Sequence, residues 1–240
     1  MRIPFTTFQV HLGRFVVPLA HLVPARAIVP ILQGPARGIF WVAGSGLMNF
    51  WLGSYERDKV DAFHRALSSG AVVYDVGANV GIYTVLACRT VGSDGRVFAF
   101  EPVPTNLFYL NWHVRLNRFL NCEVVPKAVC SHDGTVSFEC GEGPCLGKIA
   151  EDGLLQVPGV TIDSFVAEGH PAPQVMKVDV EGAEYEVLLG AQKSLATSKP
   201  VLFLATHGTE VHNRCCCLLN DLGYCLDFLT PDEIIARQSN

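Results

Sequence analysis

Three acidic residues follow short apolar stretches that have the composition of buried strands. They are Asp75, Glu101 and Asp179. When parallel strands form an open α/β sheet, their carboxyl ends meet at one edge, and ligands bind in the crevice beside that edge. Any one of these acids could simply cap a helix or lie in solvent. Three at one edge favour a ligand site, and Glu101, after the second strand, is placed to accept hydrogen bonds from both hydroxyls of a ribose.

A loop of small residues comes directly after Asp75, between an apolar strand at residues 72–76 and a predicted helix. Gly77 and Gly81 permit a sharp turn and a close approach of the backbone to a ligand, because glycine has no Cβ. The loop has neither G-x-G-x-x-G spacing nor the Lys-Ser/Thr end of a phosphate-binding P-loop. The carboxylate beside it would repel a pyrophosphate and suit a cationic ligand. S-adenosylmethionine is such a ligand, since it has no phosphate and carries an ammonium and a sulfonium group.

Strand-like runs alternate with segments of helical spacing along the chain, which predicts right-handed βαβ units and an α/β fold with a mostly parallel sheet. Residues 139–160 are rich in glycine and irregular in pattern, and they predict a mobile loop near the site. The residues after Pro231 are expected to form an acidic tail. Strands are expected at 72–76, 96–101, 123–125, 175–180, 200–205 and 224–229.

The composition limits the class of protein. A chain of 240 residues forms one domain, or one domain with an extension, and 49% apolar residues give it a sizeable core. The formal net charge of −5 argues against a general nucleic-acid binder, which normally has a basic face. The nine cysteines include no C-x-x-C pair, so we expect reduced thiols in a cytoplasmic protein.

Residues 1–53 differ from the rest and are predicted to be an N-terminal extension, with the main domain at 54–240. No Asp or Glu occurs before Glu56, whereas arginines and aromatic residues do. Prolines interrupt the apolar runs, and none reaches the ~20 residues of a spanning helix. A packed appendage with short strands at 38–42 and 49–52 is favoured over contact with a membrane surface, which the composition would also allow.

Four blocks of sequence carry a resemblance to a known family. The chain resembles the FkbM family of S-adenosylmethionine-dependent methyltransferases, over about residues 53–228. The resemblance implies a class I Rossmann-like methyltransferase fold, whose mostly parallel seven-stranded sheet has helices on both faces. It also implies O-methylation of a hydroxyl on a sugar, a glycoside or another secondary metabolite. The matching blocks are residues 73–81, 98–102, 161–165 and 176–184.

The resemblance also implies roles for individual residues. Glu101 would bind the ribose of the cofactor, with Pro102 beside it, and Ala128 would lie near the adenine. Asp179 would lie where the methyl group meets the acceptor. The amino-acid end of the cofactor would be held by Asp75, Gly77, Ala78, Asn79 and Gly81.

A hydroxyl acceptor must lose its proton during methylation, so a base or a metal is expected. The candidate catalytic residues are Asp179, Glu184 and His207, and histidine is the natural base near neutral pH. His207 could instead bond the backbone at a strand end, and Glu184 could only favour its helix N-terminus. Many relatives have a Glu two residues before this histidine, where this chain has Ala205. We therefore predict no metal requirement.

Two alternatives stay open. The chain could keep the cofactor pocket but act as a scaffold, or it could be an NAD-dependent oxidoreductase, which the loop spacing disfavours. The expected partner is a small-molecule acceptor with a sugar or polyketide-like hydroxyl, and no nucleic acid. Its pocket is predicted to be built by residues 1–55 and 139–160.

Overall fold

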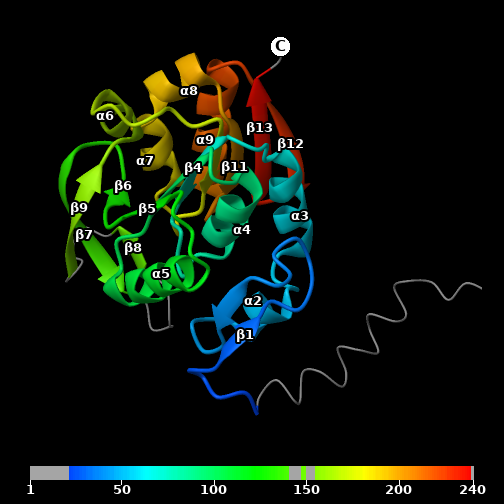
Figure 1. Cartoon of the computed structure of the whole chain (residues 1–240). Coiled ribbons are helices and arrows are strands. Elements are labelled where there is room, and N and C mark those ends of the chain that lie inside the picture. The colour runs from blue at the N-terminus through cyan, green and yellow to red at the C-terminus, as the bar shows by residue number, and fades with distance from the viewer. Residues whose placement is uncertain (1–21, 141–146, 150–154, 239–240) are drawn as a thin grey trace, which may run out of the picture.

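A central sheet of seven strands organises the chain. The computed structural model describes residues 22–140, 147–149 and 155–238 (Figure 1). Five neighbouring strands are parallel, and the last two form an antiparallel hairpin beside them. The predicted seven-stranded, mostly parallel sheet is confirmed. Its order is β12 (Tyr224–Thr230), β13 (Glu233–Gln238), β11 (Val201–Ala205), β10 (Val175–Val178), β3 (Val72–Val76), β4 (Arg96–Phe100) and β5 (Cys122–Val125).

Helices cover both faces of this sheet, because successive side chains of a strand point to opposite sides. Val73 and Val97 pack on one side, and Tyr74 and Phe98 pack on the other. The first side is covered by α3 (Arg57–Ala66), α4 (Ile82–Val91) and α5 (Pro104–Leu116). The second is covered by α6 (Ile162–Ala167), α7 (Glu184–Leu189), α8 (Gln192–Ser198) and α9 (Thr209–Asp221).

The strand predicted at residues 224–229 is β12, the first strand of a hairpin. We expected an acidic tail after Pro231, but β13 lies there and pairs with both β11 and β12. Ile234 and Ala236 are buried on one face of the sheet, and Ile235 is buried on the other. The prediction of a tail is therefore wrong, because three consecutive apolar residues complete the sheet.

A second, four-stranded sheet contains part of the region that we predicted to be an irregular loop. Its order is β6 (Ala128–Val129), β9 (Leu155–Val160), β7 (Gly134–Cys140) and β8 (Gly147–Ile149). Both β8 and β9 fall within residues 139–160, so the loop prediction is wrong for them. Residues 141–146 and 150–154 lie outside the described part of the chain.

The described part of the N-terminal extension packs into the main core. Strands β1 (Ile28–Pro30) and β2 (Phe40–Val42) form an antiparallel hairpin, which confirms the strand expected at 38–42. The strand expected at 49–52 is wrong, because α2 (Met48–Leu52) is a short helix. Its consecutive residues Phe50 and Trp51 are both buried in one core, whereas a strand would send them to opposite faces.

His113 on α5 connects this hairpin to the loop after β3. Its ring stacks on Trp41 with ring centroids 3.7 Å apart. Nε2 accepts a hydrogen bond from Val42 N at 3.1 Å, and Nδ1 donates one to Val80 O at 2.8 Å. Burial lowers the pKa of His113 to about 4, so the ring is neutral and keeps both bonds. Among the described residues, no helix has the length and apolar composition that would cross a membrane.

Candidate functional site

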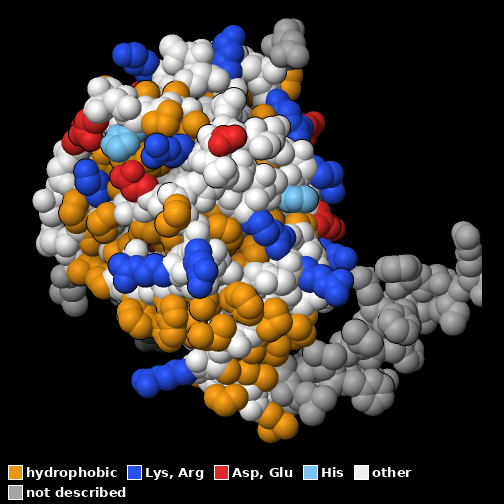
Figure 2. Space-filling view, in the orientation of Figure 1, with side chains coloured by type: hydrophobic (Ala, Val, Ile, Leu, Met, Phe, Trp, Pro, Cys, Tyr) orange, Lys and Arg blue, Asp and Glu red, His pale blue; other side chains and the backbone are white. Residues whose placement is uncertain are grey.

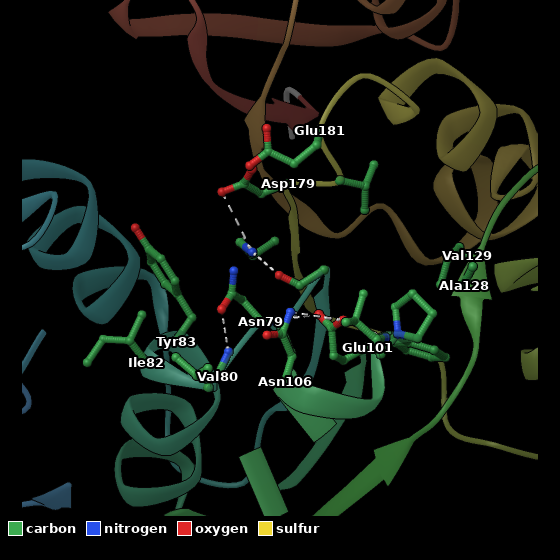
Figure 3. A pocket seen from close by; sticks show the side chains of 18 of the residues that line it. Asn79, Val80, Ile82, Tyr83, Glu101, Asn106, Ala128, Val129, Asp179 and Glu181 are labelled. Carbon is green, nitrogen blue, oxygen red and sulfur yellow. Dashed lines mark hydrogen bonds and ion pairs between the residues drawn. The ribbon is translucent and has the colours of Figure 1, made fainter. Parts of the chain in front are cut away.

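A cavity lies at the carboxyl ends of β3, β4 and β10, the edge that the three acids predicted (Figure 3). One wall is the loop after β3. Gly77 N and Ala78 N donate to Phe100 O at 3.0 and 2.9 Å, which fastens this loop to β4. Within the loop, Gly77, Asn79 and Gly81 all have positive φ angles, of 74°, 53° and 100°. The predicted cofactor residues that line the cavity are Gly77, Ala78, Asn79, Gly81, Glu101, Pro102, Ala128 and Asp179.

Gly77 is needed for a close approach as well as for its backbone angle. A Cβ at this position would overlap the carbonyl oxygen of Asp179, which belongs to the neighbouring strand end. The loop and the β10 edge are therefore in backbone contact, and only glycine fits between them.

Glu101 is the buried acid of the cavity. Its Oε2 accepts a bond from Asn79 N at 2.8 Å, and its Oε1 accepts bonds from Val103 N at 2.8 Å and Asn106 Nδ2 at 3.3 Å. Burial raises the pKa of Glu101, although these hydrogen bonds oppose that effect. Each carboxylate oxygen has two lone pairs, so these three bonds leave one lone pair, on Oε2, for a hydroxyl of a ligand.

Asp75 lies beneath the loop, and it does not line the cavity. Its side chain is fully buried, and Oδ2 accepts a bond from Thr84 Oγ1 at 2.6 Å. Lys177 Nζ lies 3.5 Å from Oδ1 and donates to Gly77 O at 2.7 Å. This geometry does not support the direct contact with the cofactor that we expected. Asp75 instead pairs with Lys177, and Lys177 binds the loop through the carbonyl oxygen of Gly77.

Asp179 lies between two ammonium groups. Its Oδ2 is 3.8 Å from Lys177 Nζ and 3.6 Å from Lys59 Nζ. Burial alone would raise the pKa of Asp179, but the two lysines and His207 outweigh burial and lower it. The carboxylate is therefore ionised at neutral pH and is a poor proton acceptor.

His207 and Glu184 form a bonded pair beside the cavity. His207 Nδ1 is 2.9 Å from Glu184 Oε1, and this carboxylate also accepts bonds from Val180 N and Gly182 N. The hydrogen bond that His207 donates to Glu184 raises the pKa of His207 to about 9; burial opposes this, and Asp179 and Glu181 add to it. Neither member lines the cavity, but His207 Nε2 is 3.9 Å from Asp179 Oδ1, in the cavity wall.

The same corner contains a group of possible metal ligands. One ligand atom from each of Asp179, Glu181 and His207 lies within 4.8 Å of the others. Lys59 and Lys177 already neutralise part of the charge on Asp179. Metal independence stays a prediction.

Sequence reasoning did not single out Lys59 as part of the site. It lies on α3, is 5% exposed, and donates to Glu233 Oε1 on β13 at 2.8 Å. The helical spacing of residues 56–69 identified the helix, but two of the three carboxylate partners of Lys59, Asp179 and Glu233, are far away in sequence. Tyr83 and Asn106 were also missed as cavity residues, whereas Phe50 and Tyr55 fall within residues 1–55, where the acceptor pocket was predicted.

The cavity has the features that S-adenosylmethionine requires. The backbone of the glycine loop lines the cavity, and a buried carboxylate with free acceptor capacity follows the second strand. The carboxylate of Asp179 suits the positive end of that molecule. The residues present therefore fit this cofactor.

Comparison with known proteins agrees with this fold. The sheet order, the position of the cavity and its residues define the chain as a class I Rossmann-like methyltransferase fold. The chain belongs to the family of the methyltransferase FkbM domain, whose profile matches residues 75–226. S-adenosylmethionine is the cofactor of this class.

Three similar proteins illustrate the match. A hexuronic acid methyltransferase, AglP of Haloferax volcanii, is 31% identical over 150 residues, which cover 58% of each protein. The methyltransferase FkbM of Methylobacillus flagellatus has a TM-score of 0.54 at 19% identity, covering 79% of this chain and 52% of that one. A precorrin-6y C5,15-methyltransferase of Geobacter metallireducens has a TM-score of 0.51 at 14% identity, covering 76% and 89%. These two structures support the fold.

The packing of Gly77 gives a testable prediction. We expect Gly77→Ala to lower the free energy of unfolding by about 1–3 kcal/mol more than Gly223→Ala, because only Gly77 would force atoms apart. Gly223 is the matched control, with a φ of 79° and nothing within 4 Å of an added Cβ. Urea denaturation of both variants measures the difference. Equal losses would contradict the close contact between the loop and Asp179.

Proposed function

We propose that this chain is an S-adenosylmethionine-dependent O-methyltransferase that acts on a hydroxyl of a sugar, a glycoside or another secondary metabolite. The observation that carries the proposal is the cavity in which Glu101 and the glycine loop lie opposite Asp179. His207 lies next to Asp179, outside the lining of the cavity. Membership of the FkbM methyltransferase family supports the reaction. Similarity to a hexuronic acid methyltransferase favours a sugar acceptor.

In this proposal, two parts of the cavity hold the donor. The carboxylate of Glu101 would accept a hydrogen bond from a ribose hydroxyl at Oε2, and Pro102 and Ala128 would line the adenine end. The loop from Gly77 to Gly81 surrounds the amino-acid end. Lys177 fixes that loop through its bond to Gly77 O, and Asp75 fixes Lys177.

The acceptor end is arranged for removal of a proton. When bound, the donor would supply a methyl group on a positive sulfur. An aligned acceptor oxygen would bond to the methyl carbon, and the sulfur would leave as a neutral thioether. Asp179, kept ionised by two lysines, lies 3.9 Å from His207 Nε2 and stabilises the positive charge that forms on that ring. Neutral His207 then takes the hydroxyl proton at Nε2, while Glu184 holds its Nδ1–H and stabilises the imidazolium that forms. This assigns Asp179, His207 and Glu184 their proposed roles.

The remaining assignments are proposals of the same kind. We place the cofactor site within residues 54–240 and part of the acceptor wall in the extension, since Phe50 and the adjacent Tyr55 line the cavity. We also propose the cytoplasm as the location, because the nine cysteines of the sequence include no C-x-x-C pair.

Binding and transfer assays test the proposed function directly. We expect calorimetry to detect binding of S-adenosylmethionine and of its demethylated product, and no binding of NAD. Labelled methyl should then appear on uronic acid glycosides and should resist alkali, because an ether at a hydroxyl is stable where a carboxylate ester is not. Label released by alkali would contradict hydroxyl methylation. Cofactor binding without transfer to any acceptor would favour the scaffold alternative, and chelation before the assay tests metal independence.

The proposed role of Glu101 predicts a loss of affinity. Glu101→Gln keeps the shape of the side chain and removes its charge, so we expect S-adenosylmethionine to bind about 10- to 100-fold more weakly. Calorimetry measures this change. Glu123→Gln, an exposed acid on β5, is the matched control and should bind normally. An unchanged affinity for Glu101→Gln would remove it from the site.

The raised pKa of His207 predicts a pH dependence. Because the ring is protonated below about pH 9, the fraction of neutral base and hence kcat should increase from pH 7 towards 9. His207→Gln should lower kcat about 100-fold or more, leave the dissociation constant of the cofactor unchanged and abolish this increase. A variant with the wild-type pH profile would show that another group takes the proton.

A further inference from the structure

Exposed apolar side chains are concentrated on one part of the surface. Among the described residues, seven of the nine large hydrophobic side chains that are exposed belong to residues 22–47 and 104–120. Figure 2 shows hydrophobic side chains gathered over the lower part of the molecule, where α5 and the β1–β2 hairpin lie. These seven residues are Leu22, Ile28, Leu32, Phe40, Leu47, Phe108 and Leu120.

The helix and the hairpin form one continuous surface, which we call the α5 face. Phe40 N donates to Asn117 Oδ1 at 2.8 Å, and Asn117 Nδ2 donates back to Phe40 O at 2.9 Å. About two and a half helical turns before Asn117, Phe108 packs against Trp112 with ring centroids 5.6 Å apart. The α5 face therefore presents aromatic and aliphatic groups from two distant segments on a rigid support.

All charged side chains that these two segments contribute are cations. Residues 22–55 and 102–122 contain no Asp or Glu. They do contain Arg26, Arg37, Arg115 and Arg118, and all four are exposed. The chain as a whole has a formal net charge of −5, so this cationic region contrasts with the rest. The preceding residues 1–21 also contain arginines and no acid.

We propose that the α5 face binds the surface of an anionic lipid bilayer. Apolar and aromatic groups enter the interface, and arginines beside them attract anionic headgroups. Two copies of the chain would bring like charges together if they paired through this face, which disfavours a symmetric dimer. Exposed aliphatic side chains such as Ile28 and Leu32 suit lipid better than nucleic-acid phosphates.

Such binding would hold the cavity close to the lipid. Asn106, in the first turn of α5, lines the cavity and bonds Glu101, while Phe108 lies two residues further on the exposed side. The inference does not depend on the proposed reaction, since it concerns a surface outside the cavity.

Sedimentation with vesicles tests the charge component. The full chain should pellet with phosphatidylcholine vesicles that contain phosphatidylglycerol, pellet much less with phosphatidylcholine alone, and dissociate when salt is added. Arg115→Glu with Arg118→Glu should weaken partitioning about tenfold or more, because each cation near an anionic surface contributes to binding. The matched control is the double variant Lys193→Glu with Lys199→Glu, which changes two exposed cations, one on α8 and one directly after it. Lys199 has a positive φ angle, as Arg118 does, so each double variant changes one residue with this backbone conformation. The control should pellet like the parent.

A second pair of variants tests the apolar component. Phe108→Ser should weaken partitioning, whereas Phe228→Ser, with a similarly exposed ring on β12, should not. Circular dichroism confirms that each variant folds. The proposal would be overturned if the variants on the α5 face pelleted with vesicles to the same extent as their controls. A lack of vesicle binding would also overturn it, whether or not the chain associates with itself or with nucleic acid through this face.

Discussion

The position of Lys177 is the interaction on which the site depends. This nearly buried ammonium group donates to the carbonyl of Gly77 and lies near both Asp75 and Asp179. A buried charge is unfavourable unless it has partners of opposite sign. The strand end of β10, the acid at the end of β3 and the backbone of the loop therefore constrain one another, and the cavity wall keeps its shape before any ligand enters.

Two further residues connect this part of the site to the N-terminal and C-terminal hairpins. Lys59 pairs with both Asp179 and Glu233, so α3 and the C-terminal hairpin both support Asp179. His113 connects Val80 in the loop to Val42 in the N-terminal hairpin. Segments outside the parallel sheet thus stabilise the site from two directions. For this reason residues 22–53 belong to the same packed core as the loop.

Much of the fold and of the candidate site could be predicted from the sequence, because the patterns that indicate them lie within a few neighbouring residues. The loop from Gly77 to Gly81 and the acid at Glu101 are each recognisable within a few residues, and both line the cavity. The helix at Met48–Leu52 and the strand at Glu233–Gln238 were not predicted, since distant packing decides them. The burial of Asp75 was missed for the same reason: its partner Lys177 lies on another strand.

The charges around Asp179 determine which group can accept a proton. A carboxylate that two ammonium groups keep ionised is stabilised as an anion, so it has little tendency to take up the proton of a hydroxyl. His207 has the opposite surroundings, because Glu184, Asp179 and Glu181 all favour its protonated form. In the proposed reaction Asp179 therefore stays an anion, and it stabilises, together with Glu184 and Glu181, the positive charge that proton transfer creates on His207. The consequence is that His207 is mostly protonated at neutral pH before the reaction, and a bound donor with a positive sulfur would reduce this protonation by repulsion.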